Sequence, residues 1–405
     1  ASALVVAKGG KLMAEGTSSL PIIFTAEDDS LTAAMVASGT YFDTNGYALD
    51  IRGEWGGIIL LGNNVTGAGT TGTATIEGIG AGEDWSTYGG TATNDNSGVL
   101  KYVSIRHGGA TVSPGNEING LTLGGVGNGT TIENIEIISN NDDGIEFFGG
   151  NVDVTNLLIF NQIDDAIDID QAYSGTITNA LVAMGTDSDN VFEIDGTESS
   201  ADPVVTGSYT INNVTAIGAS GQTKFDQYGH WKSNATGANN NIVFKDFATI
   251  TTIEGIDTDT YGSSLTFSNI DFVTTSNLAA INVATDDFDG KGSASLSSSE
   301  AEIISSQVQF SGANLCVFSG WTAYATVNTA SLCESSTVGE GGVTILSTDT
   351  TWSGDVIMDG KVVVDNGVTL TIEPGTVIKA TPKADPADAS ALVVAKGGKL
   401  MAEGT

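Results

Sequence analysis

A polar residue directly precedes an apolar-x-apolar run at a nearly regular interval through the middle of the chain. The interval is about 22 residues, and some steps are longer by about 11, as in a solenoid whose repeats carry inserted loops. We therefore expect one coil of backbone per repeat. The polar positions are Asn134, Asn156, Asn179, Asn213, Asp246 and Asn269, with Tyr102 one step earlier.

The preference for asparagine at these positions has a physical explanation. At a tight turn between two strands of a coil, asparagine adopts the left-handed backbone conformation more readily than most residues. When coils stack, the side-chain amides of successive turns can hydrogen-bond along the axis as a ladder. Asparagine acting only as an ordinary turn residue would not explain the shared register, so the pattern favours the ladder.

The chain consists largely of short β-rich runs separated by Gly, Asn, Asp and Ser, and helical periodicity is nearly absent. Alternating apolar and polar residues in such runs are typical of strands with one face in a core. The sequence therefore predicts an all-β solenoid with an Asn ladder and about 22 residues per coil plus loop insertions.

A family resemblance rests on six segments: VTLTIEPGTVIKA, SALVVAKGGKLMAEGT, LPIIFTAEDD, GEWGGIILLGN, NDDGIEFFGG and DDAIDIDQAYSG. In these segments the chain resembles right-handed parallel β-helix proteins of the pectate-lyase-like superfold, and among them secreted bacterial proteins of mostly unassigned function. The resemblance covers nearly the whole chain outside about 285–345. It implies a right-handed parallel β-helix, whereas a shared fold says little about function.

The first 17 residues, ASALVVAKGGKLMAEGT, recur unchanged at 389–405. In the family that the chain resembles, a segment like 352–380 comes first and is followed by this one, but here it stands near the end. The sequence thus begins partway into a repeating unit. We expect a β-helix body at 1–284, an atypical junction or cap at 285–345, and head coils of the next unit at 346–405.

Acidic residues outnumber basic ones by 49 to 14, which gives a formal net charge of -35. Nucleic acids and anionic membranes attract clustered Lys and Arg, so the charge argues against both as partners. The N-terminus shows no signal-peptide pattern and no apolar run has transmembrane length. With the resemblance, the composition favours an extracellular or cell-surface protein of bacterial origin.

Two cysteines, Cys316 and Cys333, stand in the atypical segment of a chain that has no others. Such a pair is typical of a single disulfide formed in an oxidising compartment, although two unpaired thiols remain the alternative.

A second column, of acidic residues, lies 12 to 14 residues after the ladder positions and includes Asp226. Apolar neighbours on both sides place the carboxylates outside the core, about 4.8 Å apart on adjacent coils. Together with acidic turn residues they favour a Ca²⁺ site, and a solvated acidic face is the alternative. The candidate ligands are Asp142, Asp143, Glu146, Asp164, Asp165, Asp168, Asp187, Asp189 and Glu193.

The same face suggests an enzyme, because polygalacturonase-type β-helix hydrolases use Asp residues on neighbouring coils as general acid and base. Asp143, Asp165, Asp168 and His230 would form such a site. However, the hydrolases' Gly-His-Gly is absent because Trp231 follows His230. The pectate-lyase arginine cluster is missing too, so the sequence leans away from catalysis.

Three aromatic residues, Trp55, Trp85 and Tyr88, either contact glycans or pack loops against the solenoid. The other histidine, His107, is expected to be a satisfied strand-end residue. No pattern indicates an organic cofactor.

Three functions remain open. The repeated segment favours a structural subunit of an extracellular fibre or stalk, whose partners are copies of itself joined head to tail or in tandem. The alternatives are a Ca²⁺-dependent adhesin or carbohydrate-binding β-helix and, less favoured, a polysaccharide lyase or hydrolase.

Overall fold

The computed structural model describes residues 2–68, 71–79, 83–111, 117–197, 205–224, 228–233, 235–247, 256–258, 261–273, 312–328, 332, 336–339, 341–372 and 376–402. Within these ranges the chain forms two compact units. The first comprises residues 1–313 and 320–326, and the second comprises 314–319 and 327–405. Residues 285–311 of the predicted junction lie outside the described part of the chain.

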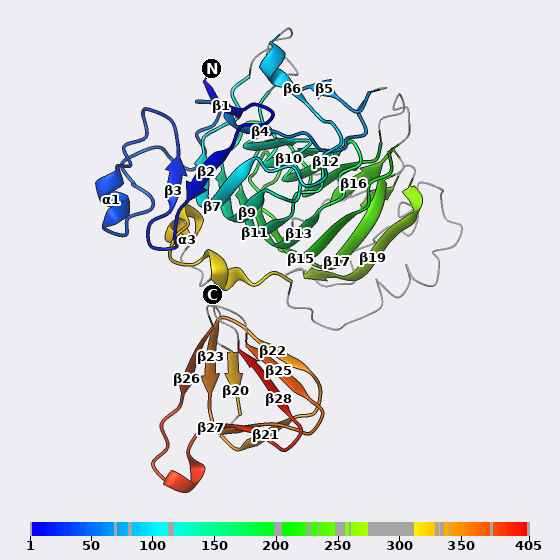
Figure 1. Cartoon of the computed structure of the whole chain (residues 1–405). Coiled ribbons are helices and arrows are strands. Elements are labelled where there is room, and N and C mark those ends of the chain that lie inside the picture. The colour runs from blue at the N-terminus through cyan, green and yellow to red at the C-terminus, as the bar shows by residue number, and fades with distance from the viewer. Residues whose placement is uncertain are drawn as a thin grey trace. The chain divides into compact units, whose positions relative to one another are not determined.

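Two long sheets of parallel strands make up the first unit (Figure 1). Sheet A contains, in spatial order, β1 (Ala3–Val6), β4 (Gly57–Leu61), β8 (Leu121–Gly124), β10 (Ile145–Phe148), β12 (Ile167–Asp170), β14 (Phe192–Asp195), β16 (Gly229–Lys232) and β18 (Ile256–Thr258). Sheet B contains β2 (Leu12–Glu15), β7 (Gly98–Arg106), β9 (Thr131–Ile138), β11 (Val154–Phe160), β13 (Thr176–Ala183), β15 (Tyr209–Ile217), β17 (Ala235–Lys245) and β19 (Tyr261–Val273), with β3 (Ile22–Phe24) also pairing with β7.

The chain alternates between the two sheets and passes one strand further at each turn, which is the parallel β-helix that the sequence predicted. Strand β12 illustrates the cause, since Ile167 and Ile169 point into the core and are at most 1% exposed. Asp168 and Asp170 alternate with them on the outer face. The smaller elements of the unit are β5 (Ala74–Thr75), β6 (Thr87–Tyr88), α1 (Ala33–Ala37), η1 (Asp84–Ser86) and most of α3 (Ala323–Val327).

The strands of sheet B bend where the ladder residues adopt left-handed backbone, with φ of 57° to 64° at the asparagines and 49° at Tyr102. The amide of Asn156 donates to Asn134 at 3.0 Å, and that of Asn179 donates to Asn156 at 2.8 Å. Later coils continue the ladder, since Asn269 donates to Asn241 at 2.7 Å and Asn241 donates to Asn213 at 3.0 Å.

The assignment of Asp246 to the ladder was therefore wrong, and Asn241 takes its place. Asn241 precedes the apolar run Ile-Val-Phe, lies opposite Asn213 and brings Ile242 and Phe244 into the core at 1% and 2% exposure. Asp246 is followed by Phe-Ala-Thr instead. Asp246 belongs to a second corner, where left-handed residues follow the last residue of a sheet B strand. This corner contains His107, Ser139, Asn161 and Asp246, with φ of 55° to 64°.

His107 is satisfied at this strand end, as expected. Its Nδ1 lies 2.7 Å from the Ile51 carbonyl oxygen, its ring packs edge-on against Tyr47 at 5.3 Å, and burial is the main cause that lowers its pKa.

The second unit is a shorter parallel solenoid of three coils with three sheets. Its sheets are β20 (Ser336–Val338), β23 (Asp355–Met358) and β26 (Val377–Ala380); β21 (Val343–Leu346), β24 (Lys361–Val364) and β27 (Ala391–Val394); and β22 (Thr350–Trp352), β25 (Thr369–Ile372) and β28 (Lys399–Ala402). The elements η3 (Leu315–Phe318) and η4 (Pro386–Asp388) also belong to this unit.

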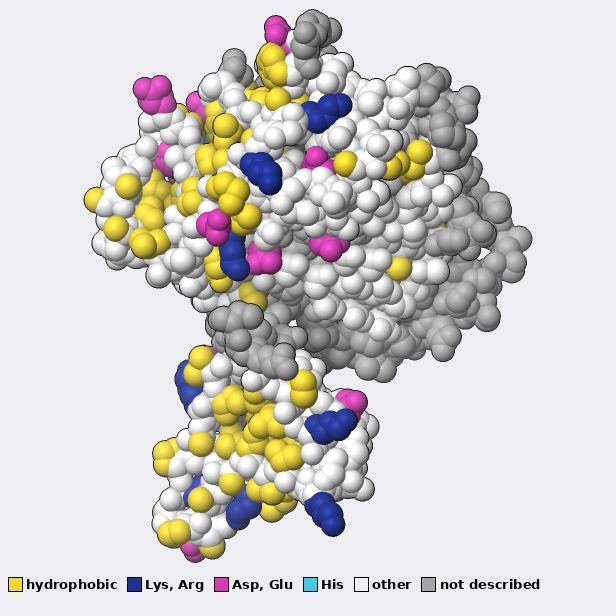
Figure 2. All heavy atoms as spheres, in the orientation of Figure 1, with side chains coloured by type: hydrophobic (Ala, Val, Ile, Leu, Met, Phe, Trp, Pro, Cys, Tyr) yellow, Lys and Arg dark blue, Asp and Glu magenta, His cyan; other side chains and the backbone are white. Residues whose placement is uncertain are grey.

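Val356, Val362 and Leu370 fill the core of the second unit with no exposed surface. Hydrophobic side chains also gather on its outside (Figure 2). The exposed set comprises Val343, Ile345, Val377, Ile378, Val393, Val394, Leu400 and Met401.

Among the described residues no helix is long and apolar enough to cross a membrane. Cys333 lies outside the described residues, so its disulfide with Cys316 stays a prediction.

Candidate functional site

The predicted acidic column lies on the outer face of sheet A. Glu146 in β10 is opposite Asp168 in β12, and Asp168 is opposite Glu193 in β14. The next position is His230 in β16, which is opposite Glu193. The column had been expected to continue at Asp226, a residue outside the described part of the chain. The outer face thus carries three acids and a histidine on four adjacent strands.

A parallel column of Asx residues lies two positions before each of the strands β10, β12 and β14. Asp143 accepts a hydrogen bond from the Asp165 backbone N–H at 2.9 Å, and Asp165 accepts one from the Asn190 N–H at 2.8 Å. Asn119 occupies the same position one coil earlier, as the pairing of Leu121 with Ile145 shows. These side chains hold the turn of one coil onto the next, which explains why Asp143 and Asp165 are buried.

Two groups of carboxylates come close enough to share a cation. Oxygens of Asp142, Asp143 and Asp164 lie within 4.8 Å of one another, as do those of Asp143, Glu146 and Asp168. Asp143 belongs to both groups and joins them. Its second oxygen remains available because only Oδ1 caps the neighbouring turn.

Burial is the largest cause of the raised pKa values in these groups. It raises the pKa of Asp142 to about 7, with further contributions from the charges of Glu77 and Asp164. Burial and the nearest carboxylates also raise the pKa values of Asp143, Glu146 and Asp168 well above the ordinary range. Near neutral pH the groups must therefore either keep protons or bind a cation that compensates their charge.

Asn119 donates hydrogen bonds to Glu146 and, at 3.3 Å, to Glu77 of the loop that follows β5. Two oxygen atoms beside this contact, Asn119 Oδ1 and Asp168 Oδ1, are buried and have no hydrogen-bond partner. A buried oxygen of this kind costs free energy unless it binds a proton donor or a metal. Oxygen donors alone suit Ca²⁺ better than a transition metal.

Asn119 and Glu77 were not among the predicted site residues. For Asn119 the signal was present, because INGLTLGG repeats the pattern of NDDGIEFFGG one coil earlier. Glu77 reaches the site from a loop whose path the sequence pattern does not reveal.

Four predicted ligands, Asp165, Asp187, Asp189 and Glu193, lie outside both carboxylate groups. Asp187 is exposed and accepts a hydrogen bond from Thr223 at 3.3 Å. Asp189 contributes its backbone N–H to the Asp164 carbonyl at 3.2 Å. Glu193 forms an ion pair with Lys232, which also contacts Asp195 at 3.2 Å.

Asp165 and Glu193 hydrogen-bond through their side chains. Burial and this contact raise the pKa of Asp165. Burial also disfavours the charged form of Glu193, but hydrogen bonds from Asp165 and Lys232 hold its pKa below the ordinary value. Asp165 is thus the protonated member of the pair, and Glu193 is balanced by a lysine rather than by a metal.

The predicted aromatic contacts divide into two kinds. Tyr88 is 1% exposed, donates to Gln171 Oε1 at 2.9 Å and packs against Phe148, so it cannot stack on a glycan. Trp55 is half-buried and donates its indole N–H to the Arg106 carbonyl at 2.6 Å. Both hold loops against the solenoid. The burial of Tyr88 corrects its glycan assignment, whereas that of the half-buried Trp55 stays a prediction.

Trp85 is 44% exposed and remains a prediction as a glycan contact. It donates its indole N–H to Glu83 at 3.0 Å, on the loop that also carries Tyr88. This loop covers the start of sheet A with a small apolar cluster that includes Ile59 and Leu61.

A family described as the pectate-lyase-like beta-helix domain matches residues 42–323. Comparisons with curated proteins and with solved structures give no match.

Proposed function

The chain belongs to the pectate-lyase-like β-helix family, and we propose that it is a structural unit of an extracellular fibre built from repeating β-solenoid units. The proposal rests on the repeated 17-residue segment, because its two copies pair with neighbouring strands on opposite sides. The partner of each unit would be another copy of the same unit, joined either covalently in tandem or by head-to-tail association.

The first copy is followed by further coils. Its strand β1 pairs with β4, so that Ala3 lies opposite Gly57, and its strand β2 pairs with β7, so that Leu12 lies opposite Gly98.

The second copy is preceded by coils. Its strand β27 pairs with β24, so that Ala391 lies opposite Lys361, and its strand β28 pairs with β25, so that Lys399 lies opposite Thr369. A single copy of the segment that kept both sets of neighbours would join the coils of the second unit to those of the first in one continuous solenoid.

The exposure of equivalent side chains supports a single segment with neighbouring strands on both sides. Val6 is 9% exposed in the first copy, whereas Val394, its equivalent, is 42% exposed in the second. A following coil would cover Val394 as the following coil covers Val6. It would remove apolar surface from water, and this favours a further coil at that edge.

Electron microscopy of the native material tests the proposal. The two copies are offset by 388 residues. The described residues form ten coils per period, namely eight in the first unit and three in the second, of which the last repeats the first. At about 4.8 Å per coil, one period extends on the order of 50 Å along the axis. Fibres with an axial repeat near that length are expected, and discrete particles one unit long would contradict the proposal.

The carboxylate groups of sheet A favour a second function, Ca²⁺ binding that stiffens the solenoid. Its support is the buried Asp168 Oδ1, which has no hydrogen-bond partner and lies beside Asp143 and Glu146. Ca²⁺ accepts six to eight oxygen ligands and would compensate the like charges that raise these pKa values. A Ca²⁺-stiffened solenoid would also suit an adhesin that contacts glycans through Trp85.

Calorimetry of the full chain with and without CaCl₂ tests the Ca²⁺ site. Saturating Ca²⁺ at about 100 times Kd should stabilise the protein by about 2.7 kcal/mol. Asp168→Asn should abolish the increase in Tm, whereas the control Asp187→Asn, at an exposed residue outside both groups, should retain it. An equal increase in Asp168→Asn would exclude this site.

A further inference from the structure

Residues 320–326, here called the strap, lie across the outer face of sheet B and belong to no strand ladder of the described residues. The strap has two aromatic anchors. Trp321 packs edge-on against Tyr102 of β7 at 5.4 Å, and Tyr324 packs against Phe160 of β11 at 5.1 Å. Both anchors are buried, at 1% and 6% exposure, so the strap covers the three adjacent strands β7, β9 and β11.

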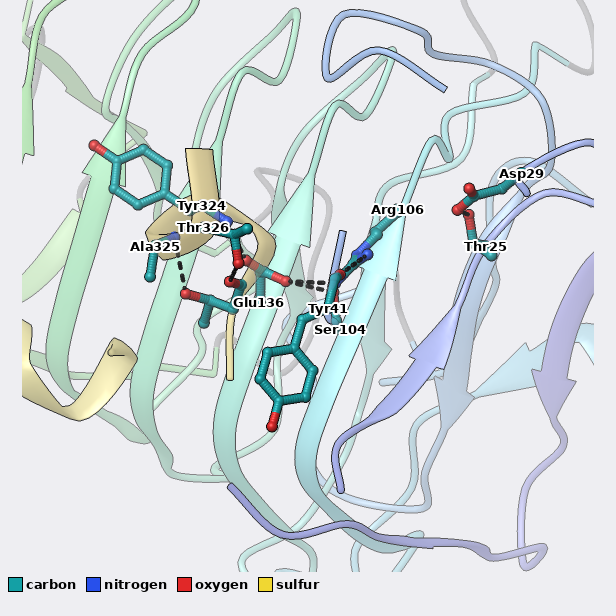
Figure 3. Close-up of polar contacts among 10 residues, drawn as sticks. Thr25, Asp29, Tyr41, Ser104, Arg106, Glu136, Tyr324, Ala325 and Thr326 are labelled. Carbon is teal, nitrogen blue, oxygen red and sulfur yellow. Dashed lines mark hydrogen bonds and ion pairs between the residues drawn. The ribbon is translucent and has the colours of Figure 1, made fainter. Parts of the chain in front are cut away.

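A buried carboxylate lies beside the strap, next to the anchor Tyr324 (Figure 3). Glu136 of β9 has no exposed side-chain surface, and its Oε1 accepts the Tyr324 backbone N–H at 3.0 Å. Its Oε2 accepts the Ser104 hydroxyl at 2.6 Å and Arg106 Nη2 at 3.3 Å. Glu136 therefore binds the strap backbone with one oxygen and the sheet with the other.

Arg106 extends the same network to a third part of the chain, because its Nη1 donates to the Tyr41 carbonyl at 2.7 Å (Figure 3). Its Nε donates to the Ser104 hydroxyl at 2.7 Å. The carboxylate is thus held in place by the solenoid and by a loop, independently of the strap.

The strap is folded locally by its own hydrogen bonds. The Thr322 hydroxyl accepts the Ala325 N–H at 3.1 Å, and the Thr326 hydroxyl donates to the Thr322 carbonyl at 3.0 Å. These bonds form one helical turn that presents Trp321 and Tyr324 to the sheet. A turn that is already ordered loses less conformational entropy when it docks.

We propose that this face of sheet B is a peptide-binding site and that the strap is its ligand, held in cis. Two aromatic anchors in a buried surface and one backbone N–H on a fixed charged acceptor are features of peptide recognition. The strap is therefore exchangeable: a peptide with the sequence of residues 320–328 occupies the same face when the strap of the chain is weakened.

Fluorescence anisotropy with a labelled, end-capped peptide of residues 320–328 tests the proposal. The full chain carrying Trp321→Ala and Tyr324→Ala keeps the face but loses both anchors of its own strap. It should bind the peptide at least about tenfold more tightly than the wild type, whose own strap competes. Absence of binding to the double variant would overturn the proposal.

Adding Glu136→Gln to the double variant should weaken peptide binding by about tenfold, because a hydrogen bond to a charged acceptor becomes a neutral one. The matched control is Glu133→Gln on the same strand, since Glu133 is 40% exposed and pairs with Lys101 instead. The control should leave peptide binding unchanged, and equal effects of both substitutions would contradict the role of Glu136.

Amide hydrogen exchange measures the contact between Glu136 and the Tyr324 N–H in a chain whose strap sequence is unchanged. In Glu136→Gln alone, the Tyr324 N–H should exchange about tenfold faster than in the wild type and in Glu133→Gln. An unchanged exchange rate would show that the Glu136 carboxylate does not hold the strap, and would overturn its assignment.

Discussion

Replacement of Asn156 tests the ladder most sharply, because this residue has a ladder partner on each side. Its amide donates to Asn134 at 3.0 Å, and its Oδ1 accepts from Asn179 at 2.8 Å. Its backbone is left-handed, with φ of 58°. Asn156→Ala removes both hydrogen bonds and places a β-carbon in a conformation that ordinary residues avoid.

The magnitude follows from these two terms. Two hydrogen bonds contribute roughly 0.5–1.5 kcal/mol each, and the left-handed conformation costs alanine roughly 1–2 kcal/mol more. Asn156→Ala should therefore destabilise these coils by about 3 kcal/mol. Asn156→Gly loses the same hydrogen bonds but tolerates the backbone, and should be about 1 kcal/mol less destabilising after its own entropic cost.

Native-state hydrogen exchange at Leu157 and Ile159 measures the local free energy of opening. Asn240→Ala is the matched control, since Asn240 also bonds two neighbours, Asn212 at 3.0 Å and Ser268 at 2.6 Å, but is absent from the left-handed residues. The loss of local stability in Asn240→Ala, measured by exchange at Ile242, should be about 2 kcal/mol, because the left-handed backbone contributes nothing at this position. A cost for Asn156→Ala below about 0.5 kcal/mol, or equal costs for its Ala and Gly variants, would refute the reasoning.

Three further predictions follow from the site, the first coil and the exposed loop. Without Ca²⁺, the contribution of Asp142 to the free energy of unfolding should be greatest below pH 3.8 and should be lost as the pH rises through about 7, because burial raises its folded-state pKa. Urea titrations in which this contribution rises with pH would contradict the prediction. Gly98→Ala places a β-carbon against the Leu12 carbonyl at φ of 117° and should cost about 2 kcal/mol or more. The control Gly9→Ala, which meets nothing within 4 Å, should cost only about 1 kcal/mol by urea unfolding. Trp85→Ala should reduce retention on a glycan array if this exposed indole contacts sugars, and undiminished retention would exclude it.

The parallel coils follow from sequence because the ladder asparagines recur with the core strands. Asn134, Asn156 and Asn179 lie one coil apart, and each must adopt the same left-handed turn. The register became ambiguous where two candidates were close together. The run ANNNIVFKDF contains both Asn241 and Asp246 directly before an apolar residue, and packing distinguishes them.

The acidic column was predictable for a similar reason, since apolar neighbours place Glu146 and Asp168 outward on successive strands. The sequence did not reveal which acids approach one another, because Glu193 is balanced by Lys232 from a later coil. Long-range contacts of this kind carry no local periodicity.

Loops that cover the solenoid were the least predictable part. The sequence left Tyr88 between a glycan contact and loop packing, and the structure shows it packed on Phe148 of sheet A. Arg106 and Glu136 occupy outward positions that alternation assigns to solvent, and they are buried because the strap and a loop cover them. Alternation within a strand indicates the face of a residue, but not what lies on top of it.

The structure of a chain containing two successive periods, determined by cryo-electron microscopy, tests the central claim most directly. In a continuous solenoid, the strand equivalent to Ala391–Val394 pairs with the next period's copy of Gly57–Leu61, in the register that Ala3–Val6 shows here. The strand equivalent to Lys399–Ala402 then pairs with the copy of Gly98–Arg106. Two separate solenoids, with the shared segment paired on one side only, would contradict the account.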